Sequence, residues 1–261
     1  MKTLRKQFIK LLNIHGVSGE EKNVRRYLAP ILTHIMDDVK IDSYGNLLAD
    51  KKCGDGNGAT ILLSAHMDTV KGVLKDRTLI ETEDGVIMSS KGVLGADDRG
   101  GIAIIMTVLR NLNKSKFNGH IKVAFSREEE VGCIGSSKID KNWYKDVDLA
   151  IVVDRRGNRD IVVGCGMAFC SDSVGYFMEE VSKMADMDWK ATEGGISDAM
   201  TFAENGINSI NLSAGYYNEH TSSEYAILGE MKETVNLILQ TLAVINQFYT
   251  GFDEVTHENK W

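Results

Sequence analysis

Three observations predict a layered α/β fold with a mostly parallel sheet. Nearly all-apolar segments at 59–65, 121–125 and 149–153 have the composition of strands that are covered on both faces. Segments with helical spacing of apolar residues separate these strands along the chain. Glycine marks the turns, since the chain has 25 glycines and a single proline. Buried strands that alternate with helices are typical of a layered α/β domain.

The spacing of apolar residues and the turn residues predict the other elements. The pattern Ser18-Gly19-Glu20-Glu21 resembles a capping box, which predicts a helix from Glu20 to about Met36. A long helix is expected over 227–248, followed by a loosely held tail over 251–261. The other expected helices cover 3–14, 102–112, 171–186 and 196–204, and the other expected strands cover 39–42, 46–49, 78–82, 85–89, 160–163, 167–169 and 207–212.

Length and composition limit the possible classes of protein. The 261 residues suit one large domain, and 43% apolar with 26% charged residues is typical of a soluble globular protein. A formal net charge of −7 argues against nucleic acid as a partner, and no apolar run approaches the length of a membrane span. The four cysteines lack the spacing of paired metal ligands and are too few for a disulfide scaffold. We therefore expect reduced thiols and a cytoplasmic location.

A histidine and an aspartate end the first of the buried strands. His66 closes the apolar run of residues 59–65, and Asp68 follows two residues later. Side chains alternate in an extended segment, so His66 and Asp68 point to the same side. A histidine that binds a metal commonly has its other ring nitrogen held by a carboxylate. The pair is compatible with a metal site.

Other metal-binding residue types recur at the ends of strands and the starts of helices. They are Asp97 and Asp98 before the helix at 102–112, Glu128, Glu129 and Glu130 after the strand at 121–125, Asp154 after the strand at 149–153, and His220 beyond the strand at 207–212. Ligands of parallel sheets collect beyond the carboxyl ends of the strands. Two histidines with several carboxylates are the residue types of two-metal hydrolysis.

Each of these groups also has an ordinary structural interpretation. The alternatives are helix-dipole stabilisation by Asp97 and Asp98, a capping box of Ser126 and Glu129, surface pairing of Asp154 with Arg155 or Arg156, and a plain loop position for His220. Their joint occurrence at one end of one predicted sheet favours a site over these separate explanations.

The same residues resemble a known family. The matching segments are 64–70, 94–101, 129–132 and 194–199, together with Asp154 and His220. In these segments the chain resembles the dizinc exopeptidases and deacylases, and their sequence is most similar to that of peptidase T. The resemblance runs in the expected order from about Ser18 to His220. It implies a three-layer αβα sandwich with a mostly parallel mixed sheet.

The resemblance also implies a set of metal ligands. Asp97 would bridge two divalent ions, His66 and Asp154 would complete one site, and Glu130 and His220 would complete the other. These nitrogen and carboxylate ligands suit zinc. Cobalt and manganese are alternatives, because metal availability as well as affinity decides which ion is used in the cell.

The resemblance assigns catalytic roles to two further carboxylates. Asp68 would orient His66, and Glu129 would act as the general base on a bridging water. Glu129 and Glu130 are adjacent, so one can face the water while the other faces the metal. Asp198 would line the wall of the site and would not be a ligand.

One interval departs from the peptidase T pattern. In that family a lid of roughly one hundred residues, the size of a small domain, precedes the Gly-Gly segment. Here only forty residues separate Asp154 from Gly194. We therefore expect residues 1–261 to form a single catalytic domain without a separate lid, in which any homo-oligomer must use another surface.

Together these observations predict a metal-dependent hydrolase of amide bonds, acting as an aminopeptidase or dipeptidase on short peptides. An N-acyl amino-acid deacylase or amidohydrolase uses the same chemistry, and a glutaminyl cyclase-like transferase shares the lid-free architecture. A catalytically silent binding protein on the same fold is an alternative of a different class. No nucleic acid or membrane partner is expected.

Overall fold

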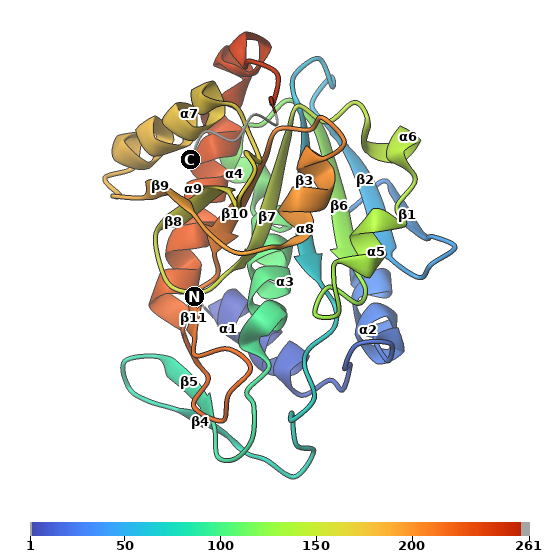
Figure 1. Cartoon of the computed structure of the whole chain (residues 1–261), viewed down its shortest axis with the longest axis vertical. Coiled ribbons are helices and arrows are strands. Elements are labelled where there is room, and N and C mark those ends of the chain that lie inside the picture. Colours follow the sequence, from blue (N-terminus) through green and yellow to red (C-terminus); the bar gives the residue numbers. More distant parts are fainter. Residues whose placement is uncertain (1, 257–261) are drawn as a thin grey trace.

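The computed structural model describes residues 2–256. Its centre is an eight-stranded sheet in the order β1-β2-β6-β3-β7-β10-β8-β9 (Figure 1). The four central strands β6, β3, β7 and β10 are parallel, whereas β2 and β8 are antiparallel to their neighbours β6 and β10. The strands are β1 (Asp38–Ile41), β2 (Leu47–Cys53), β3 (Thr60–His66), β6 (Gly119–Ser126), β7 (Leu149–Arg155), β8 (Asp160–Gly164), β9 (Lys190–Glu193) and β10 (Ser209–Ser213). The predicted mixed, mostly parallel sheet is confirmed.

The central strand β3 is buried along its whole length because helices cover both of its faces. Its side chains alternate, so Ile61 and Leu63 belong to one apolar core and Leu62 belongs to the other. The first core contains apolar residues of α1, α2, α3, α7 and α9, and the second contains apolar residues of α6 and α8. These two helical layers around the sheet form the expected αβα sandwich (Figure 1).

The helices are α1 (Lys2–Leu12), α2 (Lys22–Thr33), α3 (Ala96–Leu109), α4 (Leu112–Ser115), α5 (Ile134–Ser137), α6 (Lys141–Tyr144), α7 (Asp172–Met184), α8 (Asp198–Ala203) and α9 (Leu228–Val244), with 3₁₀ turns η1 (Ile245–Gln247) and η2 (Tyr249–Gly251). Within the described residues, every helix is too short or too polar to cross a membrane. Helix α3 is buried at every position, which fits its contacts with β3 and β7 of the sheet and with the helices α1 and α9.

A second, four-stranded antiparallel sheet lies beside the N-terminal end of α3 (Figure 1). Its order is β11 (Tyr216–Tyr217), β12 (Tyr225–Ile227), β5 (Val86–Ser89) and β4 (Leu79–Glu81). Strands β4 and β5 were expected from the sequence, whereas β11 and β12 were not. The loop between β11 and β12 carries His220, so this small sheet positions one of the predicted site residues.

Helix α2 begins later than the sequence predicts, and the capping-box interpretation is wrong. It covers Lys22–Thr33 and has no side-chain cap. The Glu21 carboxylate accepts hydrogen bonds from the backbone N–H of Gly19 at 2.8 Å and from the Arg127 guanidinium at 2.7 Å. The Ser18 hydroxyl donates to Asp68 at 2.8 Å. Both side chains are thus engaged by tertiary contacts that the local pattern does not contain.

Between Asp154 and Gly194 the chain adds β8, α7 and β9 to the main architecture. The expected strand over 167–169 is wrong, since only an isolated bridge joins Gly164 and Ala168 there. Strand β9 pairs with β8 in its place. Helix α7 packs on β9 and α9.

The first residues of the expected loose tail make specific contacts. The Phe252 ring lies 5.2 Å from the Phe177 ring of α7. The backbone N–H of Asp253 donates to the Ser173 hydroxyl at 3.0 Å, and its carbonyl accepts from the Asn208 amide at 2.9 Å. The remaining tail prediction, for residues 257–261, lies outside the described residues.

Candidate metal centre

His66 is the last residue of β3, and its imidazole is held on both sides. Its Nδ1 lies 3.2 Å from the Asp68 carboxylate, and its Nε2 faces Asp97. Asp68 also accepts hydrogen bonds from the Ser18 hydroxyl and from the backbone N–H groups of Glu129 and Glu130, at 2.8, 3.0 and 3.3 Å. Asp68 therefore ties the His66 ring to the turn that follows β6. A carboxylate beside Nδ1 is the partner that an orienting role requires, and here the contact is an ion pair, because Nδ1 lacks hydrogen-bond geometry toward the described residues.

Asp97 stands between the two histidines. Its Oδ1 lies 3.0 Å from His66 Nε2, and its Oδ2 lies 3.1 Å from His220 Nε2. The neighbouring Asp98 faces away, accepting hydrogen bonds from the backbone N–H groups of His66 and Gly101 at 3.2 and 2.9 Å. The two adjacent aspartates thus have different surroundings, and only Asp97 presents both oxygens to imidazole rings.

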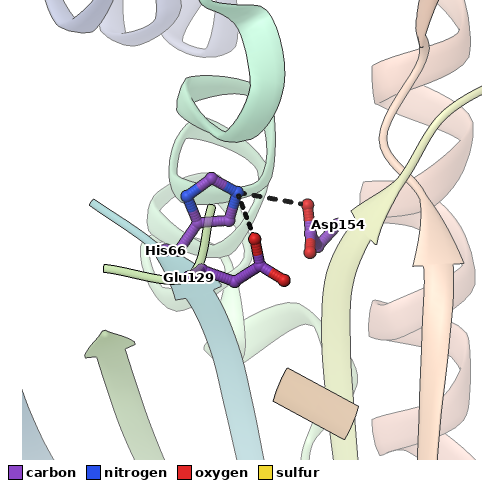
Figure 2. A group of neighbouring side chains, drawn as sticks. All are labelled: His66, Glu129 and Asp154. Carbon is purple, nitrogen blue, oxygen red and sulfur yellow. Dashed lines mark ion pairs between the residues drawn. The ribbon is translucent and has the colours of Figure 1, made fainter. Parts of the chain in front are cut away.

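The other predicted carboxylates complete two groups around Asp97. Asp154 Oδ1 lies 3.4 Å and Glu129 Oε2 lies 3.9 Å from His66 Nε2 (Figure 2). Glu130 Oε2 lies 2.8 Å from His220 Nε2 on the other side. Strand ends at one edge of the sheet, the start of α3 and the His220 loop thus bring all seven predicted residues into one cluster. Potential ligand atoms of His66, Glu129 and Asp154, and those of His66, Asp97 and Glu130, lie within 4.8 Å of one another.

The charges of this cluster are not balanced by the protein alone. Burial and the charge of Asp154 raise the pKa of Glu129 to about 9, and burial raises the pKa of Asp154 to about 7. Hydrogen bonds with Asp97 and Glu130 raise the pKa of His220 to about 10. For Asp68, burial acts to raise the pKa, but the adjacent His66 imidazole and the Ser18 hydroxyl hold it at about 2. Without cations, some of these carboxylates are ionised and others retain their protons.

The residues present fit a pair of divalent ions. Within the described part of the chain, Glu130 Oε1 is buried and has no hydrogen-bond partner, although a carboxylate oxygen in such a position needs one. Each of the two oxygens of Asp97 faces a different imidazole. Imidazole nitrogens and carboxylate oxygens are the donors that zinc takes in catalytic sites.

Two of the ordinary interpretations are wrong. The Ser126 hydroxyl donates to Asp198 at 2.5 Å and does not form a capping box with Glu129. The two arginines next to Asp154 are paired with other carboxylates, Arg155 with Asp160 and Arg156 with Glu219, at 3.0 Å each.

Sequence reasoning missed several residues that surround the cluster. The Tyr216 hydroxyl donates to Asp154 at 3.1 Å, and the Cys133 thiol donates to Glu129 Oε1 at 3.3 Å. The buried carboxylate of Glu224 accepts from three backbone N–H groups at the start of α3. Cys133 lies four residues from Glu129, so a turn prediction could have found it. Tyr216 and Glu224 reach the cluster only through the tertiary fold.

Comparison with known proteins gives a family match. A family model described as M42 glutamyl aminopeptidase matches residues 71–237. A putative aminopeptidase from Acetivibrio thermocellus is 22% identical over 323 residues, covering 89% of this chain and 96% of the relative. A peptidase T-like protein from Yersinia pestis is 36% identical over 170 residues, covering 53% of this chain and 41% of that protein. This chain therefore matches less than half the length of the Yersinia relative.

Solved structures share the fold. Aminopeptidase PepT from Bacillus cereus superposes with a TM-score of 0.84 at 17% identity, covering 93% of this chain and 98% of that chain. An aminopeptidase from the archaeon Desulfurococcus kamchatkensis superposes with a TM-score of 0.77 at 18% identity, covering 97% and 99%. At these identities the likeness establishes the fold alone.

The predicted resemblance to the dizinc peptidases is confirmed, and the matches favour an aminopeptidase over the deacylase and the non-catalytic alternatives. The family model spans well over half of the chain and includes the segments of Asp97, Glu129, Glu130, Asp154 and His220. The chain belongs to the M42 glutamyl aminopeptidase family, and its activity class is that of a metal-dependent aminopeptidase.

Proposed function

We propose that this chain removes the N-terminal residue from short peptides at a centre of two divalent ions, with zinc as the expected metal. The observation that carries the proposal is the position of Asp97, whose two oxygens lie 3.0 and 3.1 Å from the imidazoles of His66 and His220. His66, Asp97 and Asp154 would hold one ion, and Asp97, Glu130 and His220 would hold the other. Cobalt or manganese can satisfy the same donors.

When bound, the ions would polarise the scissile carbonyl and stabilise the negative charge that develops on its oxygen. The chain's own contribution is proton transfer. The Cys133 thiol donates a hydrogen bond to Glu129 Oε1, and the other oxygen, Oε2, faces the His66 side of the cluster. Glu129 would take a proton from the attacking water as the water oxygen bonds to the carbonyl carbon. It would then deliver that proton to the departing nitrogen as the C–N bond breaks.

Asp68 and Tyr216 would keep the ligands in position during this reaction. Asp68 fixes the ring of His66 through Nδ1, so Nε2 remains directed at Asp97 and Asp154. The Tyr216 hydroxyl fixes one oxygen of Asp154. Asp198, buried and bonded to Ser126, would be a wall residue.

Metal analysis combined with a peptide panel tests this proposal. We expect two equivalents of metal per chain, cleavage of dipeptides and tripeptides, and no cleavage of the same peptides after N-acetylation. Equal cleavage of the acetylated peptides would contradict the aminopeptidase assignment. A stoichiometry of one ion in fully reloaded protein would contradict the two-ion centre. A free-amine assay separates hydrolysis from cyclisation.

We further propose that residues 1–261 form one catalytic domain without a separate lid. Two observations support this. The alignment with the Acetivibrio relative is longer than this chain, so that relative contains residues without a counterpart here. Strands β8 and β9 join the main sheet, and α7 packs on α9, so the interval before Gly194 is used in the core fold. Four free cysteines support a reducing, cytoplasmic location.

Small-angle scattering tests the single-domain architecture. A compact monomer of this length should have a radius of gyration of about 18 Å. A two-lobed profile with a markedly larger radius, from a sample of verified monomer mass, would refute the proposal. The same mass measurement tests self-association, which a Pyrococcus horikoshii relative shows in tetrahedral and octahedral assemblies.

A further inference from the structure

We propose that Glu224 is a positioning residue that fixes the start of α3, which carries Asp97, relative to the loop that carries His220. We call this link the Glu224 clamp, and through it Glu224 completes the ion site formed by Asp97, Glu130 and His220. The inference rests on the two-ion centre proposed above and concerns a residue that is not itself a ligand.

The contacts of Glu224 span two segments that are distant in sequence. One carboxylate oxygen accepts from the backbone N–H of Gly95 at 2.7 Å. The other accepts from the N–H groups of Ala96 and Asp97, at 2.7 and 3.2 Å. Glu224 is almost fully buried, so these hydrogen bonds are shielded from water. One side chain therefore fixes three consecutive backbone groups, the last of which belongs to the central ligand Asp97.

The first backbone N–H groups of α3 need such a partner because the side chain of Asp98 caps only the N–H of Gly101, further along. Gly95 occupies the N-cap position with a φ of +70° and, as a glycine, has no side chain with which to cap the helix. Asp97 and Asp98 depart from helical backbone angles, so helix geometry alone does not set the direction of the Asp97 side chain. Without Glu224, these buried N–H groups would lose their acceptor, and a buried unsatisfied donor is destabilising.

The His220 loop needs the same anchor. It projects from the short pair β11 and β12, and the His220 side chain is 46% exposed. Asn218 and His220 both have positive φ, and neither is glycine. Glu224 is the last residue of this loop before β12, and its own N–H donates to Thr221 at 3.2 Å. The clamp therefore joins the base of the His220 loop to the backbone of Asp97.

The clamp acts unequally on the two ion sites. Asp97 would serve both sites. The other ligands of the first site, His66 and Asp154, are carried by β3 and β7 in the middle of the large sheet, whereas His220 of the second site lies on the loop that ends at Glu224. Loss of residues that orient metal ligands typically lowers metal affinity by about 10- to 100-fold. We expect this loss at the site with His220 and a smaller effect at the site with His66 and Asp154.

A metal titration of the whole chain tests the clamp. Metal-free wild type, Glu224→Gln and Glu224→Ala are titrated with Co²⁺, following the visible absorption and the heat of binding to obtain two dissociation constants. Glu219→Gln is the matched control. It removes a negative charge from the same loop, but its carboxylate pairs with Arg156 and not with the start of α3. Circular dichroism verifies that each variant is folded.

In Glu224→Gln one of the two Co²⁺ dissociation constants should rise about 10- to 100-fold, and the other dissociation constant should change less. The absorption band of the more weakly bound Co²⁺ ion should also change. The control should keep both constants within about threefold of wild type. Unchanged constants, or equal weakening of both sites, would overturn the clamp. So would failure of both Glu224 variants to fold, since Glu224 would then serve the fold as a whole. A wild type that binds fewer than two ions would instead overturn the two-ion proposal.

Discussion

The two histidines of the candidate centre differ in how the fold holds them. His66 ends a strand in the middle of the large sheet and is 1% exposed, with carboxylates on both ring nitrogens. His220 lies on a loop of the small sheet and is 46% exposed, with carboxylates on Nε2 alone. The backbone pairing of the sheet fixes the position of His66, whereas His220 lies on a loop outside the strands.

This difference indicates that the two proposed ion sites are preorganised to different degrees. A ligand on a rigid strand loses little conformational entropy when it binds, whereas a ligand on an exposed loop must be ordered. We therefore expect the ion beside His66 to bind more tightly and the ion beside His220 to be the first that is lost. The following predictions test this contrast, from the largest expected effect to the smallest.

The adjacent glutamates should separate chemistry from metal binding. Glu129→Gln should lower kcat about 10²- to 10⁴-fold, because an amide cannot take the proton from water. Its metal content should stay near that of wild type. Glu130→Gln should instead lose the ion beside His220, because Glu130 Oε2 lies 2.8 Å from His220 Nε2. Steady-state kinetics with metal analysis measures both. Metal loss in Glu129→Gln together with retention in Glu130→Gln would require the two roles to be exchanged.

Alanine substitutions of the two histidines compare the sites directly. In the metal-free protein His66→Ala should lower the free energy of unfolding by about 3–5 kcal/mol, because buried Asp68 and Asp97 would lose their partner. His220→Ala should cost less than this, because the His220 side chain is 46% exposed and solvent screens its ion pairs with Asp97 and Glu130. Urea unfolding measures both. Equal destabilisation would show that the fold holds the two histidines alike.

Chelation should destabilise the protein in two steps. An ion that binds only the folded state at one hundred times its dissociation constant adds about 2.7 kcal/mol. Increasing chelator should first remove the ion beside His220 with a partial fall in Tm, and then the ion beside His66. Thermal unfolding at graded free metal concentrations, with bound metal measured in parallel, follows both steps. Simultaneous loss of the ions would contradict the difference in preorganisation.

The metal-free protein should lose stability as the pH rises. Burial raises the pKa of Asp154 from 3.8 to about 7 and that of Glu129 from 4.5 to about 9, so the folded state retains protons that the unfolded chain releases. The free energy of unfolding should therefore fall between about pH 4 and pH 9, by up to about 1.4 kcal/mol per pH unit for each group in its window.

His220 acts in the same direction at higher pH. Its pKa is raised from 6.5 to about 10, so the stability that its protonated form contributes is present below pH 6.5 and is lost as the pH rises through 10. His220→Ala should remove only this upper part of the decline. In metal-loaded protein the ions take the place of these protons, so the profile should be flatter. Denaturant unfolding at several pH values checks this, and identical profiles with and without metal would contradict it.

Much of the site could be predicted because each residue sits at a place marked by the local sequence. His66 and Asp154 lie at the ends of apolar strands, and Asp97 opens a buried helix. In a parallel sheet the carboxyl ends of the strands meet at one edge, so positions in the sequence already imply proximity in space. The αβα layering follows from the same apolar strands, which must be covered on both faces.

Short-range patterns failed where a side chain had a distant partner. Ser18 and Glu21 have the spacing of a capping box, but the Ser18 hydroxyl donates to Asp68 and the Glu21 carboxylate accepts from Arg127. A strand was expected over 167–169, but β8 pairs instead with β9, which follows helix α7 in the chain. Local propensity is weaker than a tertiary hydrogen bond in a buried position, and the local pattern contains no information about such partners.

The sequence by itself determined the residue types of the centre, their order and the strands that carry most of them. Only the tertiary structure decided that Asp97 faces both histidines, that Tyr216 holds Asp154, and that Glu224 accepts from the start of α3. Glu224 and Ala96 are 128 residues apart in the chain. Such contacts arise from the packing of the small sheet against α3, and packing is a property of surfaces that meet only after the chain has folded.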